Sequence, residues 1–137
     1  MLEEKELIRL AMQAAKKAYA PYSGFCVGAA LLAKDGQVFT GCNIENAAFS
    51  PTCCAERVAV FKAVSQGVRE FAALAVFGRP LEGEARNFTA PCGVCRQVLQ
   101  EFCSPEFPVI MAKNEREYRT VPLGELLPHG FGGDFFK

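Results

Sequence analysis

Four residues in two short motifs have the types and spacing that metal-assisted hydrolysis needs. Cys54 stands two residues before Glu56 in a Cys-Ala-Glu motif, and Cys92 and Cys95 form a C-x-x-C pair directly after a proline. Three thiolates can hold a zinc ion and leave its fourth position to water, which distinguishes a catalytic site from a closed structural one. A carboxylate close to that water can accept and return its protons. The motifs therefore predict a zinc site with three cysteine ligands and Glu56 as the acid–base group.

Each of these residues also has a simpler interpretation when it is taken singly. A buried cysteine usually packs as a small hydrophobic residue, and a glutamate early in a helix usually complements the helix dipole. Two arginines are placed to contact the same site, because Arg57 follows Glu56 and Arg96 follows Cys95. A guanidinium that donates to a thiolate withdraws part of its charge, whereas the alternative is an arginine on a solvated helix face. We favour the thiolate contact for Arg57 and leave both interpretations open for Arg96.

Length and composition favour a single domain that folds without disulfides. The chain has 137 residues, enough for one domain, residues 1–137, with a core of its own. Fifteen basic and fifteen acidic residues cancel, and no apolar run approaches the length of a membrane span, which argues against nucleic acid and membranes as partners. Seven cysteines is an odd number, and the acidic N-terminus lacks the order of a secretory signal. We therefore expect reduced thiols and a cytoplasmic protein.

The apolar pattern predicts alternating helices and strands. Helices are expected at 3–18, 54–64, 93–102 and 122–127, and strands at 25–33, 38–42, 71–77, 107–112 and 118–121. This order indicates an α/β fold, a three-layer α/β/α sandwich with a mixed, roughly five-stranded sheet. Both cysteine motifs fall at the starts of predicted helices, where first-turn N–H groups and the helix dipole stabilise thiolates.

The chain resembles a known enzyme family over nearly its whole length. The pattern C-A-E…P-C-x-x-C is similar to the three-cysteine form of the signature of zinc-dependent cytidine deaminases. Six segments in collinear order resemble the short, homotetrameric members of that family: APYSGF at 20–25, VGAA at 27–30, GCNIENA at 41–47, CAER at 54–57, PCGVCRQ at 91–97 and LLP at 126–128.

The resemblance implies hydrolytic deamination of cytidine and deoxycytidine to uridine and deoxyuridine, with release of ammonia, in pyrimidine salvage. It implies one zinc ion per chain, held by the three cysteines. In that mechanism Glu56 takes a proton from zinc-bound water, the hydroxide attacks C4, and Glu56 delivers protons to N3 and to the departing amine. It also implies a homotetramer in which Phe131, just after Leu-Leu-Pro, contributes to a neighbouring subunit's site. One departure is Phe49, where many relatives carry tyrosine.

The resemblance further implies which residues bind the nucleoside. Asn43 and Glu45 match an N-x-E element that hydrogen-bonds the ribose, and Asn46 follows them in the same segment. A carboxylate beside an amide suits the hydroxyl groups of a neutral sugar. Phe25 matches the residue that packs on the base, and the backbone of Ala55 matches the group that meets its polar edge.

Other interpretations remain open at this stage. A sister enzyme with the same zinc core would act on an aminonucleoside antibiotic or on nucleic acid, although a ribose-binding carboxylate at Glu45 favours a free nucleoside. A structural or binding module would add Cys53 to the three predicted ligands and close a four-sulfur site. Thioredoxin-like redox chemistry at the C-x-x-C pair would leave the Cys-Ala-Glu motif unexplained.

Overall fold

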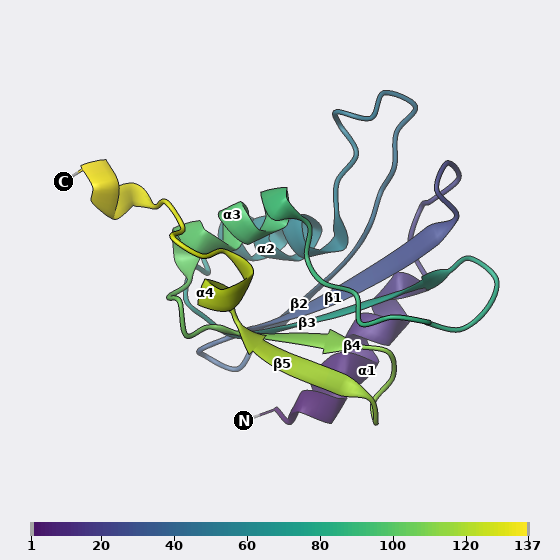
Figure 1. The fold of residues 1–137 in the computed structure, drawn as a ribbon, viewed down its shortest axis with the longest axis horizontal. Helices are drawn as coiled ribbons and strands as arrows, with labels where there is room; N and C mark the ends of the chain where they lie inside the picture. The colour runs from purple at the N-terminus through teal and green to yellow at the C-terminus, as the bar shows by residue number, and fades with distance from the viewer. Residues whose placement is uncertain (1, 137) are drawn as a thin grey trace.

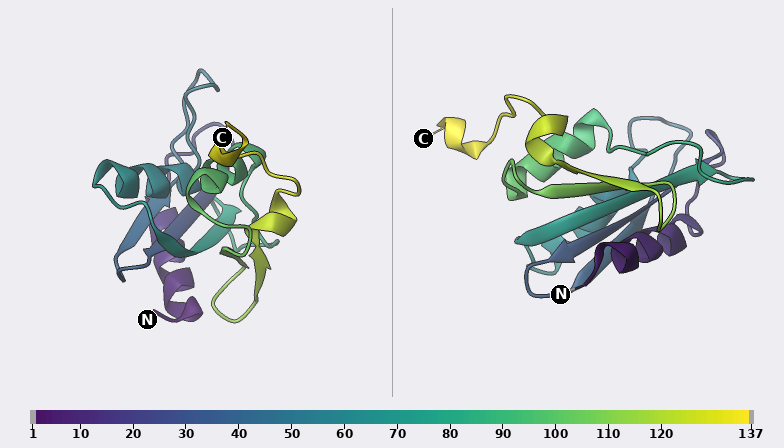
Figure 2. Two further views of the ribbon diagram at one scale, coloured as in Figure 1. Left: turned by 90° about the vertical axis from the view of Figure 1, so that its left-hand side faces the viewer. Right: turned by 60° about the horizontal axis from the view of Figure 1, so that its bottom comes forward.

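One mixed β-sheet lies between two layers of helices in the computed structural model, which describes residues 2–136 (Figure 1). The elements in chain order are α1 (Glu4–Ala15), β1 (Phe25–Ala33), β2 (Val38–Cys42), α2 (Ala55–Ser65), β3 (Phe71–Pro80), α3 (Gly93–Phe102), β4 (Pro108–Ala112), β5 (Tyr118–Pro122), α4 (Leu123–Leu126) and a final 3-10 turn, η1 (Gly133–Phe136). Helix α1 covers one face of the sheet, and α2, α3 and α4 lie over the other (Figure 2).

The strand pairing shows how the sheet comes to be mixed. The spatial order is β2-β1-β3-β4-β5, in which β1 pairs antiparallel with both β2 and β3, and β4 pairs antiparallel with β5. Only β3 and β4 run parallel, and a parallel pair needs a crossover connection, which α3 supplies. Between β1 and β2, Asp35 Oδ1 accepts a hydrogen bond from Gln37 N at 3.0 Å, and Gly36 takes a positive φ of 95° in the tight turn.

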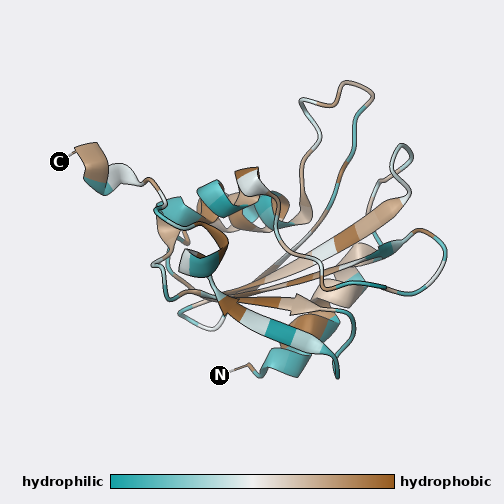
Figure 3. Ribbon diagram, viewed as in Figure 1, coloured by the Kyte–Doolittle hydropathy of each residue, from teal (hydrophilic) through white to brown (hydrophobic). Residues whose placement is uncertain are grey.

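Two hydrophobic cores lie on opposite faces of the sheet, and β1 contributes to both. Leu32 packs toward α1 with Ile8, whereas its neighbour Leu31 packs in the other core with Ala59 of α2 and Leu99 of α3. Successive side chains of a strand point to opposite faces, so a strand covered on both sides must be apolar throughout. The hydropathy of the ribbon shows this directly, since the central strands are hydrophobic while the helices are mixed (Figure 3).

The predicted fold class is confirmed, and two predicted boundaries are wrong by three residues each, whereas the others differ by at most one residue. Helix α1 ends at Ala15 rather than at 18, because the N–H groups of residues 16–18 bond to carbonyls three residues back and close a tighter turn. Strand β3 continues to Pro80 rather than ending at 77, because Phe25 at the start of β1 pairs with Pro80. Among residues 2–136, no helix is both long enough and apolar enough to cross a membrane.

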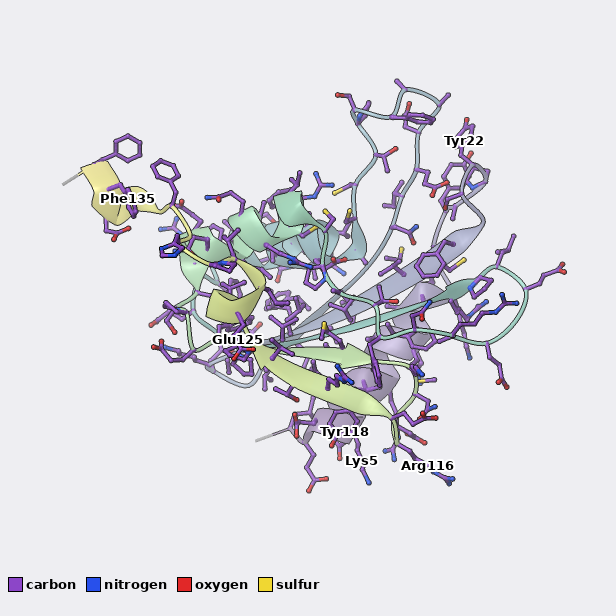
Figure 4. The ribbon with its side chains drawn as sticks, in the orientation of Figure 1. Lys5, Tyr22, Arg116, Tyr118, Glu125 and Phe135 are labelled. Carbon is purple, nitrogen blue, oxygen red and sulfur yellow. The ribbon has the colours of Figure 1, made fainter. Side chains whose placement is uncertain are left out.

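Replacing Ile8 by alanine is expected to destabilise the fold. Ile8 is fully buried between α1 and the sheet, so the change leaves a cavity that lowers the free energy of unfolding by about 2–5 kcal/mol. Lys5→Ala is the matched control, since Lys5 is exposed on the same helix (Figure 4) and its loss changes stability by less than about 0.5 kcal/mol. Urea denaturation followed by circular dichroism measures both variants. Equal midpoints for the two would contradict this core assignment.

Candidate metal centre and active site

Three cysteine sulfurs meet between the first turns of α2 and α3. Cys54 Sγ lies 3.6 Å from Cys92 Sγ, and Cys92 Sγ lies 3.4 Å from Cys95 Sγ. All three sulfurs lie within 4.8 Å of one another. Sulfurs bound at ~2.3 Å to one tetrahedral zinc ion stand about 3.8 Å apart, so the observed spacing fits zinc with little movement. The structure therefore brings the three predicted ligands into one cluster.

Two helix starts position these sulfurs. Cys54 is the N-cap residue of α2 and Cys92 is the N-cap residue of α3, both with extended backbone, and neither side chain bonds back to its own helix. Cys95 lies in the first turn of α3. The positive end of each helix dipole favours thiolate over thiol at these positions. The prediction that both motifs begin helices is confirmed.

Cys53 lies outside the sulfur cluster. Within residues 2–136, the only group of three or more potential metal ligands consists of Cys54, Cys92 and Cys95. Cys53 forms an isolated antiparallel bridge with Ile44, through hydrogen bonds in both directions between their backbones. Adjacent residues in extended backbone direct their side chains to opposite sides, which separates the Cys53 thiol from that of Cys54. The described residues do not form the alternative closed site of four sulfurs.

Glu56 is buried beside the sulfurs with one oxygen unpartnered. Glu56 is only 3% exposed, and its Oε1 makes no hydrogen bond to the described residues. A buried carboxylate oxygen without a partner is costly, so a native fold retains one mainly where a ligand or reacting group completes it. Burial is the main cause that raises the pKa of Glu56 to about 7, and the negative charge at Cys54 adds to it. The carboxyl group can thus change its protonation state near neutral pH.

Arg57 contacts the cluster from α2. Its Nη2 donates to Cys54 Sγ at 3.4 Å. The Cys95 thiol and the Arg57 guanidinium lower the pKa of Cys54 to about 5, while hydrogen bonding to Cys54 raises the pKa of Cys95. The pair therefore gives up its first proton at Cys54 and retains the second. A divalent cation would remove that difference, because metal-bound thiols are deprotonated outright.

Arg96 does not contact the sulfurs. Its Nε donates to the carbonyl of Pro91 at 2.7 Å and its Nη1 donates to the carbonyl of Leu126 at 2.8 Å. These bonds tie the start of α3 to the end of α4. The two interpretations left open from the sequence, a thiolate contact and a solvated helix face, are both replaced by this backbone anchor.

A cavity of about 290 Å³ lies between the turn at 21–24 and the loop after β2. Its lining residues are Tyr22, Ser23, Glu45, Asn46, Phe49 and Thr52. Glu45 Oε1 accepts hydrogen bonds from Tyr22 N at 2.9 Å and Ser23 N at 3.1 Å, and its Oε2 accepts one from Ser23 Oγ. The Ser23 hydroxyl is the main cause that lowers the pKa of Glu45, so the carboxylate stays ionised at the cavity wall. Tyr22 and Ser23 were not predicted as site residues, although the Pro-Tyr-Ser-Gly turn was the signal for them.

Asn43 binds the start of β1. Its Oδ1 accepts from Val27 N at 2.9 Å, and its Nδ2 donates to Phe25 O at 2.9 Å. An amide accepts two hydrogen bonds and donates two, so Asn43 has one further acceptor position and one further donor position. Phe25 is 39% exposed and Ala55, the first residue of α2, is fully buried. Asn43 thus fixes the backbone from which the exposed Phe25 ring projects.

Phe131 lies at the far end of the molecule from this cavity. It is 48% exposed and packs edge-to-face against Phe135 and Phe136, with ring centroids 5.2 Å and 5.5 Å apart. Gln97 Nε2 donates a hydrogen bond to the carbonyl oxygen of Phe131 at 2.8 Å. Phe135 and Tyr22 stand at opposite ends of the view in Figure 4, so the aromatic cluster does not reach the cavity of its own chain.

Comparison with known proteins identifies the family. Residues 1–111 match the family model described as "Cytidine and deoxycytidylate deaminase zinc-binding region". The chain belongs to the cytidine deaminase family. A cytidine deaminase from Sporosarcina psychrophila is 47% identical over 130 residues, covering 95% of this chain and 92% of that protein. The crystal structure of cytidine deaminase from Burkholderia pseudomallei is also 47% identical, with a TM-score of 0.84, covering 95% of this chain and 100% of that chain.

The same comparison bears on the alternative of a sister enzyme. A blasticidin-S deaminase from Bacillus cereus is 30% identical over 105 residues, covering 74% of each chain. This match is weaker and shorter than those to the two cytidine deaminases. The resemblance read from the motifs is confirmed at the level of the family. The zinc-binding region of the cytidine deaminase family also spans all three clustered cysteines, whose soft thiolate donors suit zinc.

The two adjacent cysteines are expected to differ sharply in metal binding. Cys54→Ser removes a clustered thiolate and should release the bound zinc, whereas Cys53→Ser should retain it, because Cys53 lies outside the cluster. Atomic absorption of each purified variant, after free metal has been removed, gives the zinc content per chain. Equal zinc content in the two variants would contradict the assignment of ligands.

Proposed function

We propose that this chain catalyses the zinc-dependent hydrolytic deamination of cytidine and deoxycytidine to uridine and deoxyuridine, with release of ammonia. The observation that carries the proposal is the buried, partly unpartnered carboxylate of Glu56 beside a sulfur cluster with the spacing of a zinc site. One zinc ion per chain would be held by Cys54, Cys92 and Cys95, within one catalytic domain of residues 1–137. Bound zinc supplies a Lewis acid that makes a water molecule acidic enough to react near neutral pH.

Glu56 moves the protons in this reaction. It accepts a proton from the attacking water, whose oxygen forms a bond to C4 of the pyrimidine, and it donates that proton to N3. When the bond between C4 and the amine nitrogen breaks, Glu56 delivers a second proton from the same water to the departing nitrogen, which leaves as ammonia. Its burial keeps bulk water away from these transfers.

Arg57 adjusts the charge of the zinc site. Three thiolates and one divalent ion together carry a net negative charge. This charge makes bound water less acidic than in a histidine-rich site. The hydrogen bond from Arg57 Nη2 to Cys54 Sγ withdraws part of that charge. Arg57 therefore supports water activation without touching the substrate.

Nucleoside recognition falls to the residues around the cavity. Glu45 and Asn46 line the cavity, and Glu45 binds the ribose hydroxyls together with Asn43. Phe25 packs on the base, and the backbone of Ala55 meets its polar edge. The carboxylate of Glu45 is already fixed by the turn at 21–24, which suits a site that must distinguish hydroxyl groups. The same charge would repel a phosphate backbone, so a free nucleoside is favoured over nucleic acid.

The assembled enzyme is a homotetramer in the cytoplasm that serves pyrimidine salvage. Phe131, Phe135 and Phe136 are 48%, 63% and 82% exposed, and a contiguous apolar surface of this kind marks a contact with another protein. Because this cluster does not reach its own cavity, Phe131 completes the site of a neighbouring subunit. All seven cysteines are free thiols, and thiolate ligands are maintained in a reducing compartment such as the cytoplasm.

Purified, zinc-loaded protein is expected to convert cytidine to uridine, which the fall in ultraviolet absorbance measures directly. Glu56→Gln keeps the size of the side chain and should keep the zinc, yet it should lower kcat by at least about 10²-fold because proton transfer is lost. Glu106→Gln, at an exposed position, is the control and should leave kcat unchanged. A zinc-loaded wild-type protein that leaves cytidine intact but deaminates an oligonucleotide would overturn the proposal.

Glu45→Ala is expected to impair recognition of the sugar rather than the chemical step. Loss of a hydrogen bond to a charged group should raise KM for cytidine by about 10- to 100-fold. The comparison substrate is 2′,3′-dideoxycytidine, which lacks the ring hydroxyls. If Glu45 binds those hydroxyls, the variant should lose much of the wild-type preference for cytidine over the dideoxy substrate. An unchanged preference, with both substrates weakened equally, would mean that Glu45 only supports the turn at 21–24.

A further inference from the structure

Helix α2 rests on the sheet at Gly41, a residue of β2. A Cβ added to Gly41 would lie 2.3 Å from the carbonyl oxygen of Ala55 and 2.7 Å from the backbone nitrogen of Ala59. Both are backbone atoms, so no side-chain movement could relieve the overlap. Ala55 stands between Cys54 and Glu56 in the chain. Helix α2 therefore lies close against the sheet at the turn that carries a sulfur of the cluster and the buried carboxylate.

The opposite face shows the same kind of contact without any site residue. A Cβ on Gly28 of β1 would lie 1.9 Å from the carbonyl oxygen of Ala11 in α1. Helix α1 contributes no residue to the sulfur cluster or to the cavity. Close packing on glycine is thus a general device of this sheet. Only at Gly41 does it determine where a helix with site residues lies.

A second contact fixes the other end of α2 to the same strand. Lys62, in the last turn of α2, donates its Nζ to the carbonyl oxygen of Thr40. Thr40 is the neighbour of Gly41 on β2. The helix is therefore seated on one edge strand at both ends, by close packing at its start and by a hydrogen bond at its end.

The position of α2 on the sheet matters because the three clustered sulfurs come from two helices, α2 and α3. The 3.4 Å separation of Cys92 and Cys95 lies within α3, whereas the 3.6 Å separation of Cys54 and Cys92 joins α2 to α3. Helix α3 is held independently, through the bonds of Arg96 to backbone carbonyls. A shift of α2 alone would therefore change the distance between helices and leave the distance within α3 unchanged.

We propose that two contacts of α2 with β2, the close packing at Gly41 and the hydrogen bond of Lys62 to Thr40, set the height of α2 over the sheet and thereby the place of Cys54 and Glu56 relative to the other two sulfurs, with Gly41 as the main positioning residue. This inference rests on the proposed zinc-dependent function. Restoring ordinary contact between a Cβ at 41 and the Ala55 carbonyl needs a shift of about 1 Å. Functional groups must hold their geometry to within about 0.5 Å, so such a shift disrupts the site while leaving its residues in place.

The test compares Gly41→Ala with Ile8→Ala, which weakens the core on the opposite face without touching α2. Both full-length variants are studied under conditions in which circular dichroism shows them folded. Zinc affinity is measured by competition with a chromophoric chelator. Cobalt(II) replaces zinc in a second sample, where the thiolate charge-transfer and ligand-field bands report the geometry of the sulfurs independently of substrate. Deamination of cytidine gives kcat and KM.

Gly41→Ala should weaken zinc binding by about 10- to 100-fold, shift the cobalt bands and lower kcat by about 10²-fold. Ile8→Ala should match the wild-type protein in zinc affinity and cobalt spectrum. Wild-type affinity and bands in Gly41→Ala, or equal changes in both variants, would overturn the proposal. Failure of the wild-type protein to deaminate cytidine would instead count against the proposed function, because the cobalt spectrum needs no substrate.

A second variant decides the question if Gly41→Ala does not fold. Lys62→Met removes the other contact that seats α2 and lies on the surface, where a fold tolerates change. It should shift the cobalt bands in the folded protein and lower kcat by a few-fold. Lys5→Met on α1 is its matched control and should change neither. An unchanged spectrum and rate in Lys62→Met would overturn the proposal.

Discussion

The meeting of two helix starts on one face of the sheet is the constraint on which the site depends. Local sequence alone brings Cys92 and Cys95 together, since they lie within one turn of each other in α3. The third sulfur comes from α2, and a full strand, β3, separates the two helices along the chain. Both helices pack in the same core on one face of the sheet, so Cys54 reaches its partners only in the folded chain. The chemistry of this protein is therefore a property of its tertiary structure.

Burial and neighbouring charges also determine the electrostatics of this site. Glu56 lies where burial opposes its charge, and the neighbouring thiolate opposes it further. Arg57 offsets part of this negative charge, because its guanidinium donates a hydrogen bond to Cys54. One of its nitrogens, Nε, is also buried without a partner among the described residues. The first turn of α2 thus carries two buried polar atoms without partners, which would be a defect elsewhere in a core, and a reacting group beside the sulfurs can complete Glu56.

The parts of the structure that could be predicted from sequence are those set by local spacing. The motifs predicted the pairing of Cys92 with Cys95 and the two helix starts, because each depends on residues a few positions apart. Arg96 could not be placed in this way, because one of its partners, the carbonyl of Leu126, is thirty residues away and belongs to the backbone. The bonds that fix Glu45 likewise come from a turn more than twenty residues earlier in the chain. Such long-range contacts depend on how the helices, strands and loops pack, so the sequence pattern does not predict them.

The N-cap positions of α2 and α3 have a consequence for the metal-free chain. Serine, threonine, aspartate or asparagine at such a position typically contributes about 1 kcal/mol by bonding to a first-turn N–H group. Here both positions hold cysteine, and neither makes a side-chain cap bond. Each helix therefore begins without a side-chain cap bond, and a metal ion held by the two N-cap sulfurs would stabilise both helix starts. Removal of such an ion would leave the first turns of both helices free to fray, so the two helix starts would lose stability together.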